Sequence, residues 1–238
     1  WRYLSKLWRL KPAIIFIGTV HAGTYPAWAP DGGRYVIPYG ISKDFMTAKV
    51  AAEPPAPRAV FSSNPLRSLD WLLDRWSQDI APQVPGAELH LFTGAATYGT
   101  IGDSKAGEMA HVLSRAGKLG DQGVRVRGPV TKTQLIEEFL SARCMLYRGD
   151  INETFCLAVG EAQAMGVPGV VQNLGSVVER VIDGETGFVT TERRAFSNAA
   201  IRLLSDNDLW RRQHETAIAR QRSWRWANAA QAFEDLIG

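Results

Sequence analysis

Hydrophobic and polar positions follow two different periods along the chain. From about residue 58 onward, short apolar or β-branched runs alternate with longer stretches in which apolar residues recur at helical spacing. This alternation is typical of βαβ units, so it predicts an α/β fold with a doubly wound parallel sheet. The expected strands are Arg58–Ser62, Glu88–Thr93, Gly123–Arg127, Cys144–Tyr147, Pro168–Gln172 and Gly187–Thr190.

Helices are expected between these strands and at the C-terminus. The first interval carries one apolar stripe that we predict to be core, and residues 206–237 predict two helices of mixed charge. Gly99–Gly107 is glycine-rich but has neither P-loop order nor dinucleotide-binding spacing, which predicts a surface loop. The stripe consists of Leu66, Leu69, Leu72, Leu73 and Trp76.

The first forty residues do not continue this pattern. Trp1–Leu10 has the spacing of an amphipathic helix, while Ala13–Ile17 and Arg34–Pro38 have the composition of strands. Too few residues are present here for an independent core. We therefore interpret residues 1–40 as the end of a preceding domain, with a boundary near residues 40–57 and the proline-rich segment Ala51–Arg58 as a linker.

Composition narrows the classes of function. The 238 residues, 45% of them hydrophobic, suffice for one full α/β core, and a net charge of +3 gives no general case for nucleic-acid binding. Cys144 and Cys156 lack metal-ligand spacing and lie in apolar surroundings, which indicates buried thiols in the reducing cytoplasm. No apolar run approaches the roughly 18 residues of a membrane-spanning helix. Because the chain starts at Trp1 rather than methionine, we interpret it as processed or truncated.

The segment Asn152–Val189 contains Glu153 and Glu161 with seven residues between them. A helix is expected to start near Thr154 or Phe155, and the amides of its first turn would suit a diphosphate. Glu161 has small apolar neighbours and needs a strong donor, which a ribose diol would supply. In the alternative interpretation, Glu153 merely favours a helix N-terminus and Glu161 faces solvent or a lysine.

This segment resembles the E-x7-E block of the retaining GT-B glycosyltransferases, the family 4-like "glycosyl transferases group 1". Further segments match in order: Val36–Ile41 (VIPYGI) resembles the interdomain strand and turn of the family, and Gly184–Val189 (GETGFV) resembles a hairpin of the family. Pro65–Leu73 resembles the phosphate-contacting helix start, and Gly123–Val130 resembles the strand before the base pocket. The resemblance covers about residues 35–238.

The resemblance implies a Rossmann-like domain that binds a nucleotide-sugar donor, and transfer of the sugar to an unknown acceptor. Residues 1–40 would be a fragment of the acceptor-side domain, 41–216 the donor-binding domain, and 217–238 a helix that packs back toward the N-terminal domain. With so short an N-terminal part, the chain as given is expected to bind donor but to transfer sugar poorly. A non-catalytic nucleotide-sugar-binding module of a larger assembly is the alternative. An NAD-dependent enzyme is disfavoured, because no G-x-G-x-x-G follows the first full strand.

The resemblance also assigns roles to residues of the glutamate block. Glu161 would bind the ribose, and Glu153 would contact hydroxyls of the transferred sugar as a catalytic residue. The family usually has Gly-Phe-Gly at the sugar-contacting turn, where this chain has Thr154-Phe155-Cys156, so the approach of the backbone to the sugar is more crowded. This change is tolerable if the backbone stays at negative φ, but it narrows which donor fits. The residues that would face the sugar and diphosphate are Thr154, Phe155, Cys156 and Leu157.

Phosphate and base contacts follow from the same resemblance. The family pairs an arginine and a lysine at the first strand-to-helix turn, and here Ser62 and Arg67 take those two positions. Arg67 would therefore face the diphosphate as the single catalytic cation, although without the family match it would be a surface arginine. Gly128, Pro129 and Val130 would wall the nucleobase. No metal and no cofactor are expected, since cationic side chains and helix dipoles carry the phosphate charge in this fold.

Weaker signals remain outside this set. Glu179 matches another acid frequent in the family and is expected to be structural. His21 is interpreted as a loop histidine, although a histidine of the N-terminal domain approaches the donor in the family. Two basic aromatic stretches, Trp1–Lys11 and Arg211–Trp226, indicate interdomain packing, with peripheral contact to a membrane surface as the alternative.

Overall fold

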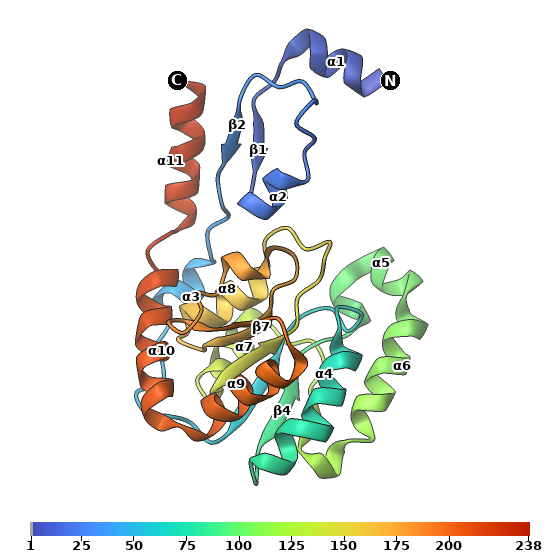
Figure 1. The fold of residues 1–238 in the computed structure, drawn as a ribbon, viewed down its shortest axis with the longest axis vertical. Helices are drawn as coiled ribbons and strands as arrows, with labels where there is room; N and C mark the ends of the chain where they lie inside the picture. Colours follow the sequence, from blue (N-terminus) through green and yellow to red (C-terminus); the bar gives the residue numbers. More distant parts are fainter. Residues whose placement is uncertain (1) are drawn as a thin grey trace.

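The computed structural model describes residues 2–238, which form a large and a small parallel sheet with the helices around them (Figure 1). The large sheet has six strands in the order β5-β4-β3-β6-β7-β8. The α/β fold with a parallel sheet is therefore confirmed, and each predicted strand is present to within two residues at either end. The strands are β3 Arg58–Phe61, β4 Glu88–Leu91, β5 Val124–Val126, β6 Cys144–Tyr147, β7 Gly169–Gln172 and β8 Gly187–Thr190.

Helices cover both faces of the central strands. Every residue of β6 and β7 is buried, and successive side chains of a strand point to opposite faces, so both faces must be covered. α9 packs against β6, β7 and β8, while α8 packs against β6 and β7 and is itself covered by α3 and α10. The helices of this domain include α3 Lys43–Thr47, α4 Leu69–Arg75, α6 Ala106–Gly117, α7 Lys132–Phe139, α8 Leu157–Ala164, α9 Arg193–Ser205 and α10 Asn207–Gln221.

The N-terminal segment forms a small unit next to the carboxyl edge of the large sheet (Figure 1). Its two strands pair in parallel, and the helix α11 lies beside them in Figure 1. The chain passes between the two parts at Pro38, whose carbonyl accepts a hydrogen bond of 3.0 Å from Trp224 Nε1. Trp1 lies outside the described residues. The elements are α1 Arg2–Leu10, β1 Ile14–Phe16, α2 Thr19–Gly23, β2 Arg34–Val36 and α11 Trp226–Ile237.

Two local predictions are wrong. Leu66 is 37% exposed rather than core, because it lies in a turn before α4 in which its amide donates to Asn64 Oδ1 at 2.9 Å. Gly99–Gly107 is not a loop, since α5 (Gly99–Ser104) and the start of α6 occupy it. Packing of α5 on α6 there overrides the low helix propensity of the glycines. The remainder of the predicted stripe is fully buried at Leu69, Leu72, Leu73 and Trp76.

The turn after α8 fixes the position of α10. Gly166 adopts a φ of +75° there, and a Cβ at this position would lie 2.3 Å from the His214 ring. His214 Nδ1 donates to the Gly166 carbonyl at 2.6 Å, and the ring stacks on Trp210 at 4.4 Å between centroids. Burial lowers the pKa of His214, which keeps the ring neutral. This turn therefore needs glycine both for its backbone conformation and for the close approach of α10.

Gly166→Ala and Gly86→Ala separate these two requirements. Gly86 has nearly the same φ, +76°, but an added Cβ there would meet nothing within 4 Å. Both variants should lose roughly 1–2 kcal/mol for a left-handed alanine. Gly166→Ala should lose at least about 1 kcal/mol more, because the His214 ring must move. Urea unfolding measures the difference, and equal losses would show that the contact with α10 contributes nothing.

Candidate functional site

The large sheet has a topological switch point between β3 and β6. The chain leaves β3 toward β4 and β5 and returns to the other side of β3 at β6. In open α/β sheets, ligands bind in the crevice at the carboxyl ends of the strands at such a point. Arg67 follows β3 and Glu153 follows β6, and Arg67 Nη1 donates to Glu153 Oε1 at 2.6 Å. The structure thus brings the two predicted catalytic residues together at the expected edge.

Both carboxylate oxygens of Glu153 accept a hydrogen bond from a side chain. Its side chain is 6% exposed, and its second oxygen accepts a hydrogen bond of 2.8 Å from the Tyr147 hydroxyl. Burial raises the pKa of Glu153, and the Tyr147 hydrogen bond and the Arg67 charge oppose that rise. Sequence reasoning missed Tyr147, although a hydroxyl at the carboxyl end of the buried strand Cys144–Tyr147 was a usable signal.

The loop after Glu153 departs from the prediction. α8 begins at Leu157 rather than at Thr154 or Phe155, because its N-cap Cys156 adopts a left-handed conformation with φ +61° and ψ +68°. Cys156 therefore does not meet the condition of negative φ under which the loss of glycine at this turn would be tolerable. Phe155 and Cys156 are buried, whereas Leu157 is 43% exposed.

A second left-handed residue lies next to the site. Ser68, directly after Arg67, has a φ of +61°, and Lys11 is the remaining non-glycine residue with positive φ between residues 2 and 238. Such conformations cost on the order of 1–3 kcal/mol each and persist where the surroundings enforce them. Two of the three flank the Arg67–Glu153 pair. Backbone strain is therefore concentrated at the switch point.

The predicted base wall lies at the carboxyl ends of β4 and β5. Gly128, directly after β5, has a φ of +73°, and Val130 packs against the core. Pro129 approaches the loop that follows β4, since a Cβ at Gly94 in that loop would lie 3.0 Å from Pro129 Cδ. These three residues therefore line the same edge of the sheet as Arg67.

Glu161 has a partner that the sequence offered as an alternative. Its side chain is 13% exposed, and its Oε1 accepts a hydrogen bond of 3.0 Å from Lys132 Nζ. Burial raises the pKa of Glu161, and Lys132 opposes the rise. Lys132 is 59% exposed, and its ammonium also lies 5.7 Å from the centre of the Phe45 ring. Glu161 is thus held by an ion pair whose lysine is largely exposed to solvent.

Glu179, His21 and Ser62 are the remaining residues that the sequence analysis singled out. Glu179 Oε1 accepts from Val20 N at 2.6 Å and from Thr19 Oγ1, so it ties the N-terminal segment to the main domain. His21 Nδ1 accepts from Ile17 N at 3.3 Å, within its own segment. Ser62 Oγ is buried without a partner. Within residues 2–238, the structure contains neither a cluster of three potential metal ligands among His, Cys, Asp and Glu nor a helix able to cross a membrane.

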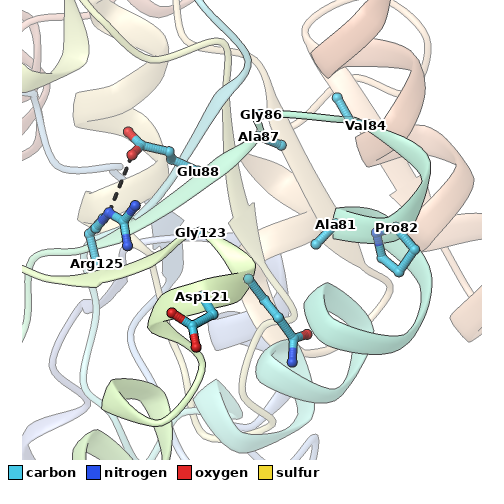
Figure 2. A pocket seen from close by; sticks show the side chains of 10 residues that line it. Ala81, Pro82, Val84, Gly86, Ala87, Glu88, Asp121, Gly123 and Arg125 are labelled. Atoms are coloured by element: carbon cyan, nitrogen blue, oxygen red, sulfur yellow. Dashed lines mark hydrogen bonds and ion pairs between the residues drawn. The ribbon is translucent and has the colours of Figure 1, made fainter.

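A separate hollow of about 520 Å³ opens at the opposite edge of the sheet (Figure 2). Glu88 and Gly123, at the amino ends of β4 and β5, line it, and Arg125 Nε donates to Glu88 Oε1 at 3.2 Å. Ligands of open α/β sheets bind at the carboxyl ends instead. This hollow is therefore not part of the candidate site.

The chain matches the family model for glycosyl transferases group 1 over residues 57–206 and belongs to that family. Its curated relatives include D-inositol 3-phosphate glycosyltransferases. The one from Corynebacterium diphtheriae is 28% identical over 136 residues, which are 56% of this chain and 32% of that protein. The one from Streptomyces coelicolor is 34% identical over 115 residues, 48% of this chain and 25% of that protein. The matched regions thus span at most about a third of these relatives.

Solved structures share the fold. HepE of Anabaena in complex with UDP and glucose has a TM-score of 0.73 at 16% identity, covering 99% of this chain and 65% of that one. Sucrose-phosphate synthase of Thermosynechococcus elongatus has a TM-score of 0.71 at 20% identity, covering 94% and 57%. At these identities, the likeness establishes the α/β architecture.

Tyr147→Phe tests the pairing of the buried carboxylate. The variant leaves Glu153 Oε2 without its donor and should lose about 1–3 kcal/mol of unfolding free energy above the pKa of Glu153. The pKa of Glu153 in the folded state is raised above its ordinary value of 4.5. The protonated Glu153 side chain therefore stabilises the folded state at low pH, and this stabilisation is lost as pH rises through the folded-state pKa. The variant raises this pKa further, and its deficit should therefore grow with pH.

Urea unfolding below and above the ordinary glutamate pKa measures this effect. Tyr35→Phe, which alters a tyrosine that is 39% exposed, is the matched control and should show no such pH dependence. A deficit of equal size on both sides of the glutamate pKa would contradict the proposed contact.

Proposed function

We propose that the chain is the donor-binding part of a retaining glycosyltransferase, which transfers a sugar from a nucleotide sugar to an unknown acceptor. Membership of the glycosyl transferases group 1 family supports glycosyl transfer, and HepE with UDP and glucose is a fold neighbour. The observation that carries the proposal is the Arg67–Glu153 pair at the β3–β6 switch point. Residues 41–216 would hold the donor, with 1–40 on the acceptor side and 217–238 packing back toward it. The two free, buried cysteines favour a cytoplasmic location.

Arg67 would neutralise the diphosphate. Its side chain is 40% exposed although one nitrogen binds Glu153, so the rest of its guanidinium can receive phosphate oxygens. The first-turn amides of α8, from Leu157 on, would add the positive end of a helix dipole. Both groups would stabilise the charge that develops on the leaving diphosphate. The acceptor would attack from the same face, as in retaining transfer.

Glu153 would accept hydrogen bonds from hydroxyls of the transferred sugar. Its orientation is fixed by Arg67 and Tyr147, so little reordering would be required when the donor binds. Glu161 would bind the ribose after Lys132 moves aside, and Gly128, Pro129 and Val130 would wall the base. The backbone from Thr154 to Leu157 would contact the sugar and diphosphate.

A non-catalytic nucleotide-sugar-binding module is the second candidate. Ser62, which takes the position of the family's second cation, favours it, because a single arginine would hold the diphosphate less tightly. Donor binding by the full-length gene product without transfer or hydrolysis would select this candidate over the first.

A thermal-shift panel of UDP-, GDP- and ADP-sugars in excess EDTA tests the proposal directly. At least one donor should raise the melting temperature, because Arg67 and the α8 amides can neutralise the diphosphate without a divalent cation. The same panel with magnesium is the control. A strict requirement for magnesium would contradict metal-independent binding, and no shift with any donor would contradict donor binding itself.

Glu161→Ala and Glu153→Ala separate the two proposed roles. Glu161→Ala should weaken nucleotide binding by about 1.5–3 kcal/mol, the range for hydrogen bonds to a charged partner. Glu153→Ala should leave the affinity for free UDP or GDP unchanged and reduce transfer. Calorimetric titration measures affinity, and Glu53→Ala, at a 76% exposed carboxylate, is the control. An equal loss of nucleotide affinity in both variants would overturn this division.

A further inference from the structure

A cavity of about 340 Å³ lies where the N-terminal segment joins the main domain. Its lining comes from the segment after β2, from Gln163 of α8, from Glu179 and the residues that follow it, and from the end of α10 and the turn after it. Pro38, Ile182 and Trp224 supply apolar surface, and Arg180 supplies a guanidinium. None of these residues belongs to the proposed donor site.

The Arg180 side chain is partly buried, and it has no ion-pair partner among the described residues. Its Nε has no hydrogen bond, and no carboxylate of the described chain forms an ion pair with it. Arg58, Arg75 and Arg143 also have a buried Nε without a partner, but another nitrogen of each is bonded to a carboxylate, carbonyl or amide oxygen. Arginine stays protonated in proteins, so an unpaired buried guanidinium is unfavourable.

Two neighbours act on this charge without forming an ion pair with it, and the negative charge of Glu179 offsets it only in part. The Phe155 ring centre lies 4.3 Å from the Arg180 guanidinium, which provides a cation–π contact but no negative charge. Glu179 is adjacent in sequence, but its Oε1 accepts from Val20 N and Thr19 Oγ1. That carboxylate is already engaged by the start of α2.

Arg220 lines the same cavity and can supply a second positive charge. Its Nη2 lies 3.4 Å from Glu185 Oε2, and the two side chains are 62% and 51% exposed. Exposed pairs of this kind contribute little to stability, so Arg220 can turn toward another anion. The cavity is thus lined by one unpaired and one weakly paired guanidinium.

We propose that this cavity binds a phosphoryl group, either of inorganic phosphate or of a small phosphate monoester. Arg180 would be its main ligand and Arg220 its second. A guanidinium presents a planar fork of donors that matches phosphoryl oxygens, and two of them neutralise a dianion. The volume falls at the small end of ligand pockets, roughly 300–1,000 Å³, and Ile182 and Trp224 would contact the organic part of a monoester.

Phosphate titrations distinguish this cavity from the donor site. Melting temperature and calorimetric affinity are measured with inorganic phosphate and with glycerol 3-phosphate, at an ionic strength held constant with sodium chloride. Wild type and Arg67→Met should both be stabilised by phosphate. Arg180→Met should lose at least about tenfold in phosphate affinity, as expected for the loss of a charge-assisted hydrogen bond. Tighter binding of glycerol 3-phosphate than of inorganic phosphate would identify a monoester as the ligand, and the reverse would identify the free ion.

Three results would overturn the proposal. The first is that the wild type does not bind phosphate. The second is that Arg67→Met loses phosphate binding while Arg180→Met retains it. The third is that Arg180→Met binds phosphate with unchanged affinity. If Arg180→Met does not fold, Arg180→Lys and Arg220→Met replace it, and both should weaken phosphate binding; unchanged affinity in both contradicts the site. The donor panel uses nucleotide sugars in phosphate-free buffer, so failure here leaves the proposed transferase function intact.

Discussion

The carboxylate of Glu153 lies in the protein interior, and the carboxyl edge of the sheet at the switch point is organised around its charge. Arg67 neutralises one oxygen and the Tyr147 hydroxyl binds the other, so three segments distant in sequence fix one another. Removing either partner would leave a buried charge or acceptor uncompensated, which is strongly unfavourable. The loop that leads from Glu153 into α8 contains the left-handed Cys156. Sheet topology, buried charge and backbone strain therefore coincide at one place.

The other end of the proposed donor site is organised differently. Glu161 is paired with Lys132, whose ammonium is largely exposed, whereas the Arg67–Glu153 pair is anchored by a fully buried tyrosine. Binding of a ribose would therefore replace the Lys132–Glu161 bond with hydrogen bonds from the ribose hydroxyls to Glu161. The transferred sugar would instead meet Glu153, whose partners already fix its orientation. Under the proposed function, the sugar end is preorganised and the nucleotide end adapts.

The elements with a clear hydrophobic period could be predicted from the sequence. The strands and the stripe from Leu69 to Trp76 follow from which positions must be buried, and the two glutamates could be located because the family's spacing is preserved. The partners of those glutamates were predicted less well: a lysine was only one alternative for Glu161, and Tyr147 was missed, because both partners meet the glutamates only through tertiary packing. The start of α8 was missed because cysteine rarely adopts the left-handed conformation that tertiary contacts impose on Cys156. Gly99–Gly107 forms helix for the same reason, against its local propensity.

The two thiols of the chain have different surroundings, which makes them internal reporters of motion. Cys144 lies in the central strand β6, whereas Cys156 lies in the strained loop between Glu153 and α8, and both are free and buried. Burial raises the pKa of each thiol, to about 12 at Cys144, so alkylation requires exposure to solvent. The modification rate of Cys156 would therefore measure how often the loop opens, and that of Cys144 how often the whole sheet unfolds. A bound donor that closes the loop would slow the first rate and separate local from global opening within a single molecule.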